Sequence, residues 1–276
     1  MSTTITFPFN DLPIELQREV FVVAANIDQR TALRLVLVAR RFYRWLQPHI
    51  YEMVTLGSDD TALFLRTMGS LPQQFFANSV KKLCLSVSVS GRNATRILRA
   101  CTGVTDLAFW VDYIGTVPNR SLIPYISPLP LRKLSAEVSH FLALFPTGEI
   151  IHPWCECLTH LDIIFWTHEM APVIPPLDRL PSLTHLALRL RHNQTQEAAL
   201  STILSTCRAL KVLIIFDDAE EAAEEKVWTV DPRVVFMPYP TNVVREWEAQ
   251  ARQEESCSWS RAEELVRRHA ANRGRS

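Results

Sequence analysis

The segment HPWCECLTH, residues 152 to 160, is the part of the chain whose residue types most suggest chemistry. It places His152, Cys155, Cys157 and His160 within nine residues. Imidazole nitrogen and thiolate sulfur are ligands that zinc prefers. Paired zinc-binding cysteines are usually separated by two to four residues, whereas Cys155 and Cys157 are separated by one. A metal-dependent enzyme or sensor is therefore one hypothesis, and the spacing argues against it.

The cysteines also recur at one position of a longer repeat. Cys101, Cys155 and Cys207 each stand six residues before the leucine of an apolar-x-x-Leu-x-apolar pattern. A residue type that recurs in this way is most simply a small apolar side chain packed under a helix end. We therefore predict a structural role for these cysteines, with no bound metal and no cofactor.

The same pattern predicts the elements that position these residues. Its central leucines are separated by 24, 27, 27, 25 and 27 residues. They are Leu83, Leu107, Leu134, Leu161, Leu186 and Leu213. A period of about 25 residues built on a short alternating strand is typical of a leucine-rich-repeat solenoid. Returning helices are expected over residues 92–100, 139–145 and 194–205.

The resemblance to leucine-rich-repeat proteins covers residues 80 to about 220 and has one departure. The Asn or Cys that the family places three residues after the last strand position is missing from every coil. Those positions hold Ser88, Asp112, Ser139, Trp166, Arg191 and Asp218. The expected fold is therefore an α/β solenoid, an irregular array of short parallel strands with returning helices, preceded by a small all-helical module.

Residues 11 to 52 have a different pattern. Pro13 suits the first turn of a helix, and Leu16, Val20 and Val23 follow at helical spacing. A second apolar helix is expected from residue 33 to residue 46, with Pro48 ending it. So small a unit cannot bury this much apolar surface alone. A partner or an abutting domain must cover the rest.

These residues resemble an F-box. The resemblance rests on LPIEL at 12–16 and LVARRFYRW at 37–45, with Ala39 in place of the usual Cys and Phe42 in place of the usual Trp. Together with a degenerate repeat, it is similar to the F-box-like families of mushroom-forming fungi. The resemblance implies docking on the Skp-type adaptor of a cullin-RING ubiquitin ligase. The implied adaptor contacts are Leu12, Pro13, Leu16, Leu33, Val38 and Phe42.

The expected domain organisation has three parts. Residues 1–55 form the F-box-like module, 56–240 the degenerate solenoid, and 241–276 a C-terminal helical cap. In the cap, Trp247 and Trp259 are expected to seal the last repeat. Ser260 and Glu263 have the spacing of a capping box, which marks a helix start.

Composition limits the function classes. A formal net charge of +0 gives no reason to expect nucleic acid or a membrane surface as a partner. We find no apolar run of about 20 residues and no secretory signal, and six cysteines are too few for a disulfide framework. A cytoplasmic or nuclear location is expected. No glycine-rich phosphate loop, Gly-x-Ser-x-Gly or HExxH motif occurs, so no enzymatic activity is predicted.

The expected function is that of a ligase substrate receptor whose solenoid binds a protein target. Aromatic and basic residues after the strands are the predicted target contacts, because tryptophan and arginine carry much of the binding energy at interfaces. They are Trp110, Trp166, Arg189 and Arg191. The alternative is a leucine-rich-repeat interaction scaffold in which residues 11–52 only cap the solenoid and have no ligase link.

Overall fold

The computed structural model describes residues 9–27, 29–111, 122–145, 152–165, 177–190, 197–217 and 231–273. The chain forms two compact units, Met1–Met53 and Val54–Ser276, which we call the N-terminal unit and the sheet unit. The boundary between them lies near the expected residue 55. The C-terminal helices, expected to form a separate cap over residues 241–276, cluster with the sheet.

The N-terminal unit is helical, with η1 (Phe9–Asp11), α1 (Ile14–Ile27), α2 (Gln29–Leu35) and α3 (Arg40–Ile50). The prediction of one continuous helix from 33 to 46 is wrong, because Ala39 is extended (φ −158°, ψ 153°) and α3 begins after it. Pro48 lies inside the last turn of α3, where its missing N–H costs only one helical hydrogen bond.

The sheet unit is built on eight parallel strands whose spatial order is their sequence order. The strands are β1 (Met53–Leu56), β2 (Lys82–Leu85), β3 (Asp106–Phe109), β4 (Lys133–Glu137), β5 (His160–Phe165), β6 (His185–Leu190), β7 (Val212–Asp217) and β8 (Val234–Pro238). Consecutive parallel neighbours require a crossover after every strand.

Most of the crossovers carry short helices. They are α4 (Ser58–Ser70), α5 (Gln73–Ser79), α6 (Gly91–Ala100), α7 (Ile123–Ile126), α8 (Val138–Leu144), η3 (Pro153–Glu156), η4 (Leu177–Arg179) and α9 (Glu197–Thr206). The predicted helices over 92–100, 139–145 and 194–205 correspond to α6, α8 and α9. Two further helices follow β8, α10 (Val243–Arg252) and α11 (Ser258–Arg273).

The central leucines of the repeat form one row across the sheet. Strand register pairs Leu83 with Leu107 and continues through each neighbour to Leu213. All six side chains of this row are at most 2 % exposed. Each coil thus buries the same position against the next coil, as expected of a solenoid. The prediction of an α/β solenoid preceded by a small helical unit is confirmed.

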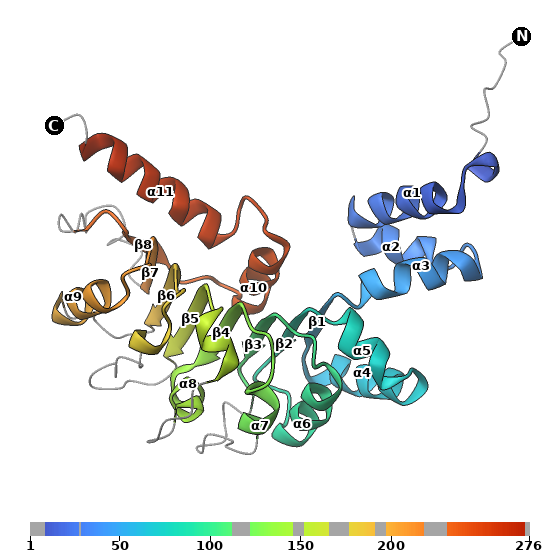
Figure 1. The fold of residues 1–276 in the computed structure, drawn as a ribbon, viewed down its shortest axis with the longest axis horizontal. Helices are drawn as coiled ribbons and strands as arrows, with labels where there is room; N and C mark the ends of the chain where they lie inside the picture. The colour runs from blue at the N-terminus through green and yellow to red at the C-terminus, as the bar shows by residue number, and fades with distance from the viewer. Residues whose placement is uncertain are drawn as a thin grey trace, which may run out of the picture. The chain divides into compact units, whose positions relative to one another are not determined.

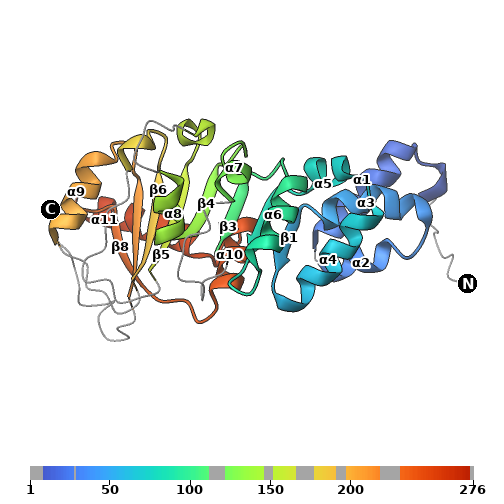
Figure 2. The ribbon, with the colours of Figure 1, turned by 90° about the horizontal axis from the view of Figure 1, so that it is seen from below.

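Both faces of the sheet are covered (Figures 1 and 2). Helices α6, α7 and α8 lie on one face of the sheet, which we call the outer face, and α10 and α11 lie on the opposite, inner face. Lys133, Ser135 and His160 line a cavity with Trp247 of α10, so the alternating leucines of the row point to the outer face. Strands β5 and β6 are accordingly buried on both sides, with only His160 partly exposed. No helix in the described ranges is long and apolar enough to cross a membrane.

Candidate functional site

The segment from His152 to His160 is packed in part, since His152, Trp154, Cys155 and Leu158 are buried whereas Cys157 is exposed. His152 is fully buried, with Nδ1 2.9 Å from the Ser127 hydroxyl and Nε2 against the Leu144 carbonyl. Cys155 is buried too, and burial raises the pKa of its thiol. Among the described residues no three His, Cys, Asp or Glu side chains are grouped to hold a metal ion. The burial of Cys155, like that of Cys101 and Cys207, fits the packing role predicted for the cysteines of the repeat.

The N-terminal unit carries a large exposed apolar surface. Seven of its aliphatic side chains are between 47 % and 84 % exposed. They are Ile14, Leu16, Val20, Val23, Leu33, Leu37 and Val38, and we call them the apolar surface. In the described part of the sheet unit, two large hydrophobic residues are exposed, Leu63 and Val87. Exposed apolar side chains are therefore concentrated in the smaller unit.

The elements of this unit explain why these side chains are exposed. Leu16, Val20 and Val23 lie at i, i+4 and i+7 of α1 and form one stripe along it. The neighbouring face of α1, around Ala25 and Phe21, packs on α2 and α3 instead. Leu37 and Val38 stand in the turn between α2 and α3, which the extended Ala39 terminates.

The predicted adaptor contacts fall into two groups. Pro13, Leu16, Leu33 and Val38 are exposed, and Leu12 is half-buried. Phe42 is only 5 % exposed, so the prediction that it contacts a partner does not fit its place in the structure. Its ring stacks on Phe21 with centroids 3.8 Å apart, which makes it a core residue of the unit.

The predicted adaptor contacts do not include Ile14, Val20, Val23 and Leu37, which are also exposed. The helical spacing of Val20 and Val23 predicted an apolar face, but spacing alone does not tell a buried face from an exposed one. Gln17 also went unnoticed. It is buried and donates from Nε2 to the Leu12 carbonyl oxygen at 2.8 Å, which fixes the Leu12–Pro13 entry to α1.

The inner face of the sheet unit is unusually polar for a covered surface. Register aligns Lys82, Asp106, Lys133, His160 and His185 in one row from β2 to β6. Ser135 and Asp162 pair in the row above it. Helices α10 and α11 cover the part of this row from Asp106 to His185, together with an apolar region on β7 and β8.

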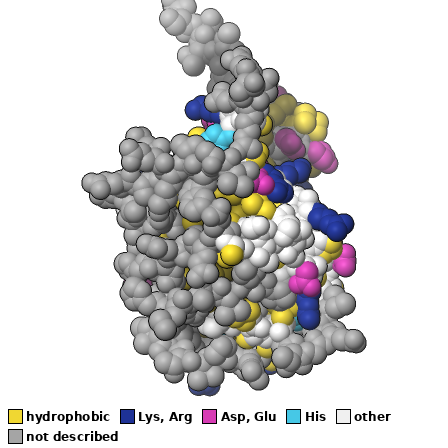
Figure 3. All heavy atoms as spheres, turned by 90° about the vertical axis from the view of Figure 1, so that its left-hand side faces the viewer, with side chains coloured by type: hydrophobic (Ala, Val, Ile, Leu, Met, Phe, Trp, Pro, Cys, Tyr) yellow, Lys and Arg dark blue, Asp and Glu magenta, His cyan; other side chains and the backbone are white. Residues whose placement is uncertain are grey.

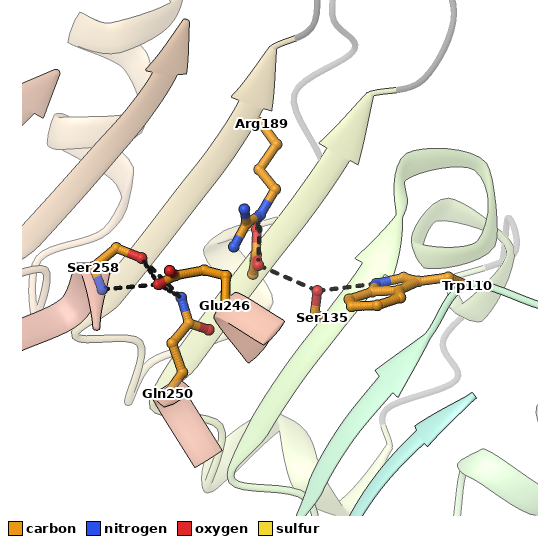
Figure 4. Close-up of polar contacts among 7 residues, drawn as sticks. Trp110, Ser135, Arg189, Glu246, Gln250 and Ser258 are labelled. Carbon is orange, nitrogen blue, oxygen red and sulfur yellow. Dashed lines mark hydrogen bonds and ion pairs between the residues drawn. The ribbon is translucent and has the colours of Figure 1, made fainter. Parts of the chain in front are cut away.

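A buried hydrogen-bonded network crosses this face (Figure 4). Arg189 donates from Nε to both carboxylate oxygens of Asp162 at 2.9 Å. Ser135 donates to the same carboxylate at 3.3 Å and accepts from Trp110 Nε1 at 3.1 Å. The Arg189 guanidinium also lies 4.4 Å from the centre of the Phe216 ring. Its Nη1 and Nη2 atoms are buried without a hydrogen-bond partner.

Two of the predicted target contacts, Trp110 and Arg189, belong to this network. Trp110 is 2 % exposed and Arg189 fully buried, so neither side chain presents surface to a partner in this conformation. Both were predicted as surface contacts, and the structure places them in the buried network of the inner face instead. Trp166 and Arg191 lie outside the described residues.

Two histidines join α11 to the sheet. The rings of His160 and His185 stack in parallel with centroids 4.2 Å apart, and Trp259 meets both edge-on. His185 Nε2 is 3.0 Å from Glu263 Oε1 on α11. Burial, helped by His185 and Lys133, lowers the pKa of His160 to about 3. His160 is therefore neutral at physiological pH and fills a packing role.

A small cavity lies between α10 and strands β3, β4 and β5. Its volume is about 20 Å³, and its lining includes Asp106, Lys133, Ser135, His160 and Trp247. This is room for about one water molecule and not for an organic substrate. Figure 3 views the molecule from the side of the last strands, where the described basic and acidic side chains are intermixed.

Neither comparison of the sequence with known proteins identifies a relative. No protein-family model matches the chain, and no curated protein matches it. The structure itself shows a helical N-terminal unit followed by an array like that of leucine-rich repeats. Its two notable features are an exposed apolar surface on the first unit and a polar stripe under α10 on the second.

Proposed function

We propose that the protein is a non-catalytic substrate receptor of a Skp–cullin–F-box ubiquitin ligase. In this proposal the N-terminal unit docks on the Skp-type adaptor, and the sheet unit binds a protein target. The receptor supplies proximity between the target and a ubiquitin-loaded enzyme. The observation that carries the proposal is the apolar surface, which coincides with the segment that resembles an F-box.

The energetics favour a partner for this surface. Fully burying one Val, Leu or Ile side chain contributes about 1.5 to 3 kcal/mol relative to leaving it exposed. Seven such side chains on a unit of about fifty residues offer enough apolar area to offset part of the cost of association. Contiguous exposed apolar patches on soluble proteins commonly mark interaction sites.

The resemblance and the burial pattern support each other. The F-box-like motif begins at Leu12–Pro13, where Gln17 holds the backbone in place. Phe42 and Leu46 are buried in the core of the unit, whereas Leu33 and Val38 are exposed. The unit therefore has an interior of its own and does not need its exposed aliphatic residues for folding.

Co-expression with a Skp-type adaptor followed by co-purification tests the proposal. We expect the wild type to form a one-to-one complex, and the double variant Val23→Asp, Leu37→Asp to lose it. Both residues are more than half exposed, so the substitutions leave the core intact. Arg44→Asp is the matched control, because it places the same new side chain at an exposed position of α3, a helix that carries none of the seven residues.

The alternative predicts a different result. If the wild type purifies alone, folded and monodisperse, residues 11–52 are only a cap and the chain is a scaffold without a ligase link. Loss of the complex in Arg44→Asp as well would show that the assay does not report on the apolar surface.

A further inference from the structure

Helix α6 on the outer face carries a row of exposed arginines. Arg92, Arg96 and Arg99 stand at i, i+4 and i+7, so their side chains share one side of the helix. The other side of α6, which includes Ala94 and Ile97, is buried. From the first arginine to the last the helix rises by about 10 Å. We call these three side chains the arginine row.

The helices on either side of the arginine row contain no acidic residue. Helices α5 and α7 both contact α6, and neither has an Asp or a Glu. Between Asp60 and Asp106 the chain has six basic residues and no acidic one. They are Arg66, Lys81, Lys82, Arg92, Arg96 and Arg99. Because the whole chain has a net charge of +0, positive charge is concentrated in this part of it.

The stability of α6 does not account for its arginines. Arg92 lies in the first turn, where the positive end of the helix dipole disfavours a cation. Arg92 and Arg96 are like charges at i and i+4, a pairing that destabilises a helix. Neither guanidinium forms a hydrogen bond or an ion pair with another described residue. Departures from local rules of this kind are typical of functional surfaces.

The third arginine is held in place by an aromatic ring. Arg99 Nη2 donates to the Tyr125 hydroxyl of α7 at 2.8 Å, and its Cζ atom lies 5.4 Å from the centre of that ring. Beyond Arg99, the Lys81 ammonium lies beside Gly103, in the turn that follows α6. One end of the arginine row is therefore ordered before any partner binds, which reduces the entropy lost on association.

The chemistry of the arginine row indicates a partner that bears carboxylates. A guanidinium presents its N–H donors in a planar fork that matches the two oxygens of a carboxylate or a phosphate. Nucleic-acid binding draws on many phosphate contacts and on a strongly basic domain. This chain has a net charge of +0, so the carboxylates of a protein segment suit the row better.

We infer that the arginine row is the docking site for an acidic segment of the target protein, whose carboxylates are spread over about 10 Å to match the rise of α6. This inference rests on the proposed function, since it assumes that the sheet unit is the part that binds a target. The outer face at α6, and not the covered polar face under α10, is then the part of the sheet unit that selects the target.

A fluorescein-labelled peptide that repeats Glu-Glu-Ser is the probe, and the same peptide with Gln in place of Glu is its control. In fluorescence anisotropy at low salt, we expect the wild type to bind the acidic peptide alone. The full-length variant Arg92→Gln, Arg96→Gln should bind it about tenfold more weakly, because two charge-assisted contacts are lost. The matched variant Arg245→Gln, Arg261→Gln removes the same charge from exposed positions of α10 and α11 and should bind as the wild type.

An Arg92→Gln, Arg96→Gln protein that binds the acidic peptide as tightly as the wild type overturns the inference. Equal loss of binding in the matched variant does so too. A labelled single-stranded DNA of the same charge tests the other class of partner. Tighter binding of the DNA than of the peptide, lost in Arg92→Gln, Arg96→Gln, would make the row a nucleic-acid surface instead.

If the double variant does not fold, carbodiimide coupling on the wild type decides. The reagent joins peptide carboxylates to nearby lysine amines, and mass spectrometry identifies the lysines. We expect coupling at Lys81, beside α6, in preference to the exposed Lys211 before β7. Coupling at Lys211 that equals or exceeds that at Lys81 would overturn the inference. None of these experiments contains the adaptor, so their outcome is separate from that of the co-purification test.

Discussion

At the scale of single residues, the buried pair of Arg189 and Asp162 shows how much a covered polar face depends on complete pairing. The carboxylate is held by Arg189 and Ser135, and still burial keeps its pKa raised. A buried ion pair adds little net stability, because desolvation offsets the attraction. Removing one partner, however, strands the other charge in the interior. Removing one partner should therefore lower stability strongly, whereas replacing both by apolar residues should lower it much less.

Replacing Arg189 by methionine should lower the free energy of unfolding by about 3 to 5 kcal/mol, because Asp162 is left buried and unpaired. The double variant Arg189→Met, Asp162→Leu should recover at least half of that loss. Urea unfolding of the three proteins measures both effects. If the double variant is as unstable as the single one, the network matters for more than charge pairing.

The low pKa of His160 sets a pH dependence of stability. Its ordinary value of 6.5 is lowered to about 3 in the folded protein, so only the unfolded chain takes up the proton between these values. The free energy of unfolding should therefore fall as pH decreases through this window, by roughly 2 to 3 kcal/mol from this group between pH 7 and 4.5.

The variant His160→Phe keeps a ring in the stack and removes the titrating group. Its free energy of unfolding should decline less steeply than that of the wild type below pH 6.5, as measured by urea unfolding at several pH values. Parallel curves for the two proteins would show that His160 does not contribute to the slope.

At the scale of elements, the leucine row carries the solenoid. Each leucine packs under the same position of the next coil, and all six are at most 2 % exposed. The row could be predicted because the leucines recur every 24 to 27 residues, so that successive strands pair with their leucines side by side. Strand β1 was missed, since its sequence MVTL precedes the first spaced leucine and shows no period of its own.

Tertiary packing overruled several local signals. The capping box of Ser260 and Glu263 lies inside α11, which begins at Ser258, because Glu246 of α10 caps that helix from outside. The burial of Trp110 and Arg189 was equally hidden from the sequence. Trp110 bonds to Ser135 of β4 and Arg189 to Asp162 of β5, residues 25 and 27 positions away, and no local pattern specifies such contacts.

A substitution in the middle of the leucine row should be severe. Leu161→Ala removes a fully buried side chain and leaves a cavity, so we expect a loss of about 3 to 5 kcal/mol in the free energy of unfolding. Leu63→Ala in α4 is the matched control, because Leu63 is 53 % exposed, and its effect should stay below about 1 kcal/mol. Similar losses for both variants in guanidinium unfolding would contradict the solenoid packing.

At the scale of the whole molecule, the two units differ in what they expose. Strands β3 to β6 are buried on both faces apart from Lys133 and His160, whereas the N-terminal unit leaves seven aliphatic side chains exposed. The apolar excess of residues 11–52 could be predicted from the sequence, and we propose that a partner covers it. The side chains of the inner face could not be placed in the same way, because the repeat does not specify them.

Without its partner, the exposed apolar surface should make the protein self-associate. We expect the apparent mass in sedimentation velocity to rise with concentration for the wild type, and to stay at the monomer value for Leu37→Lys, Val38→Lys. Both residues are more than 60 % exposed, so the substitutions alter the surface and not the core. Equal association of the two proteins would show that self-association occurs through another surface.

The central claim is that this apolar surface binds a Skp-type adaptor. Isothermal titration calorimetry of the purified full chain with the purified adaptor at several temperatures tests it most directly. We expect one-to-one binding with a negative change in heat capacity, the mark of apolar burial, and its loss in Val23→Asp, Leu37→Asp. Absence of binding by the folded wild type, or equal binding by the double variant, would contradict the claim.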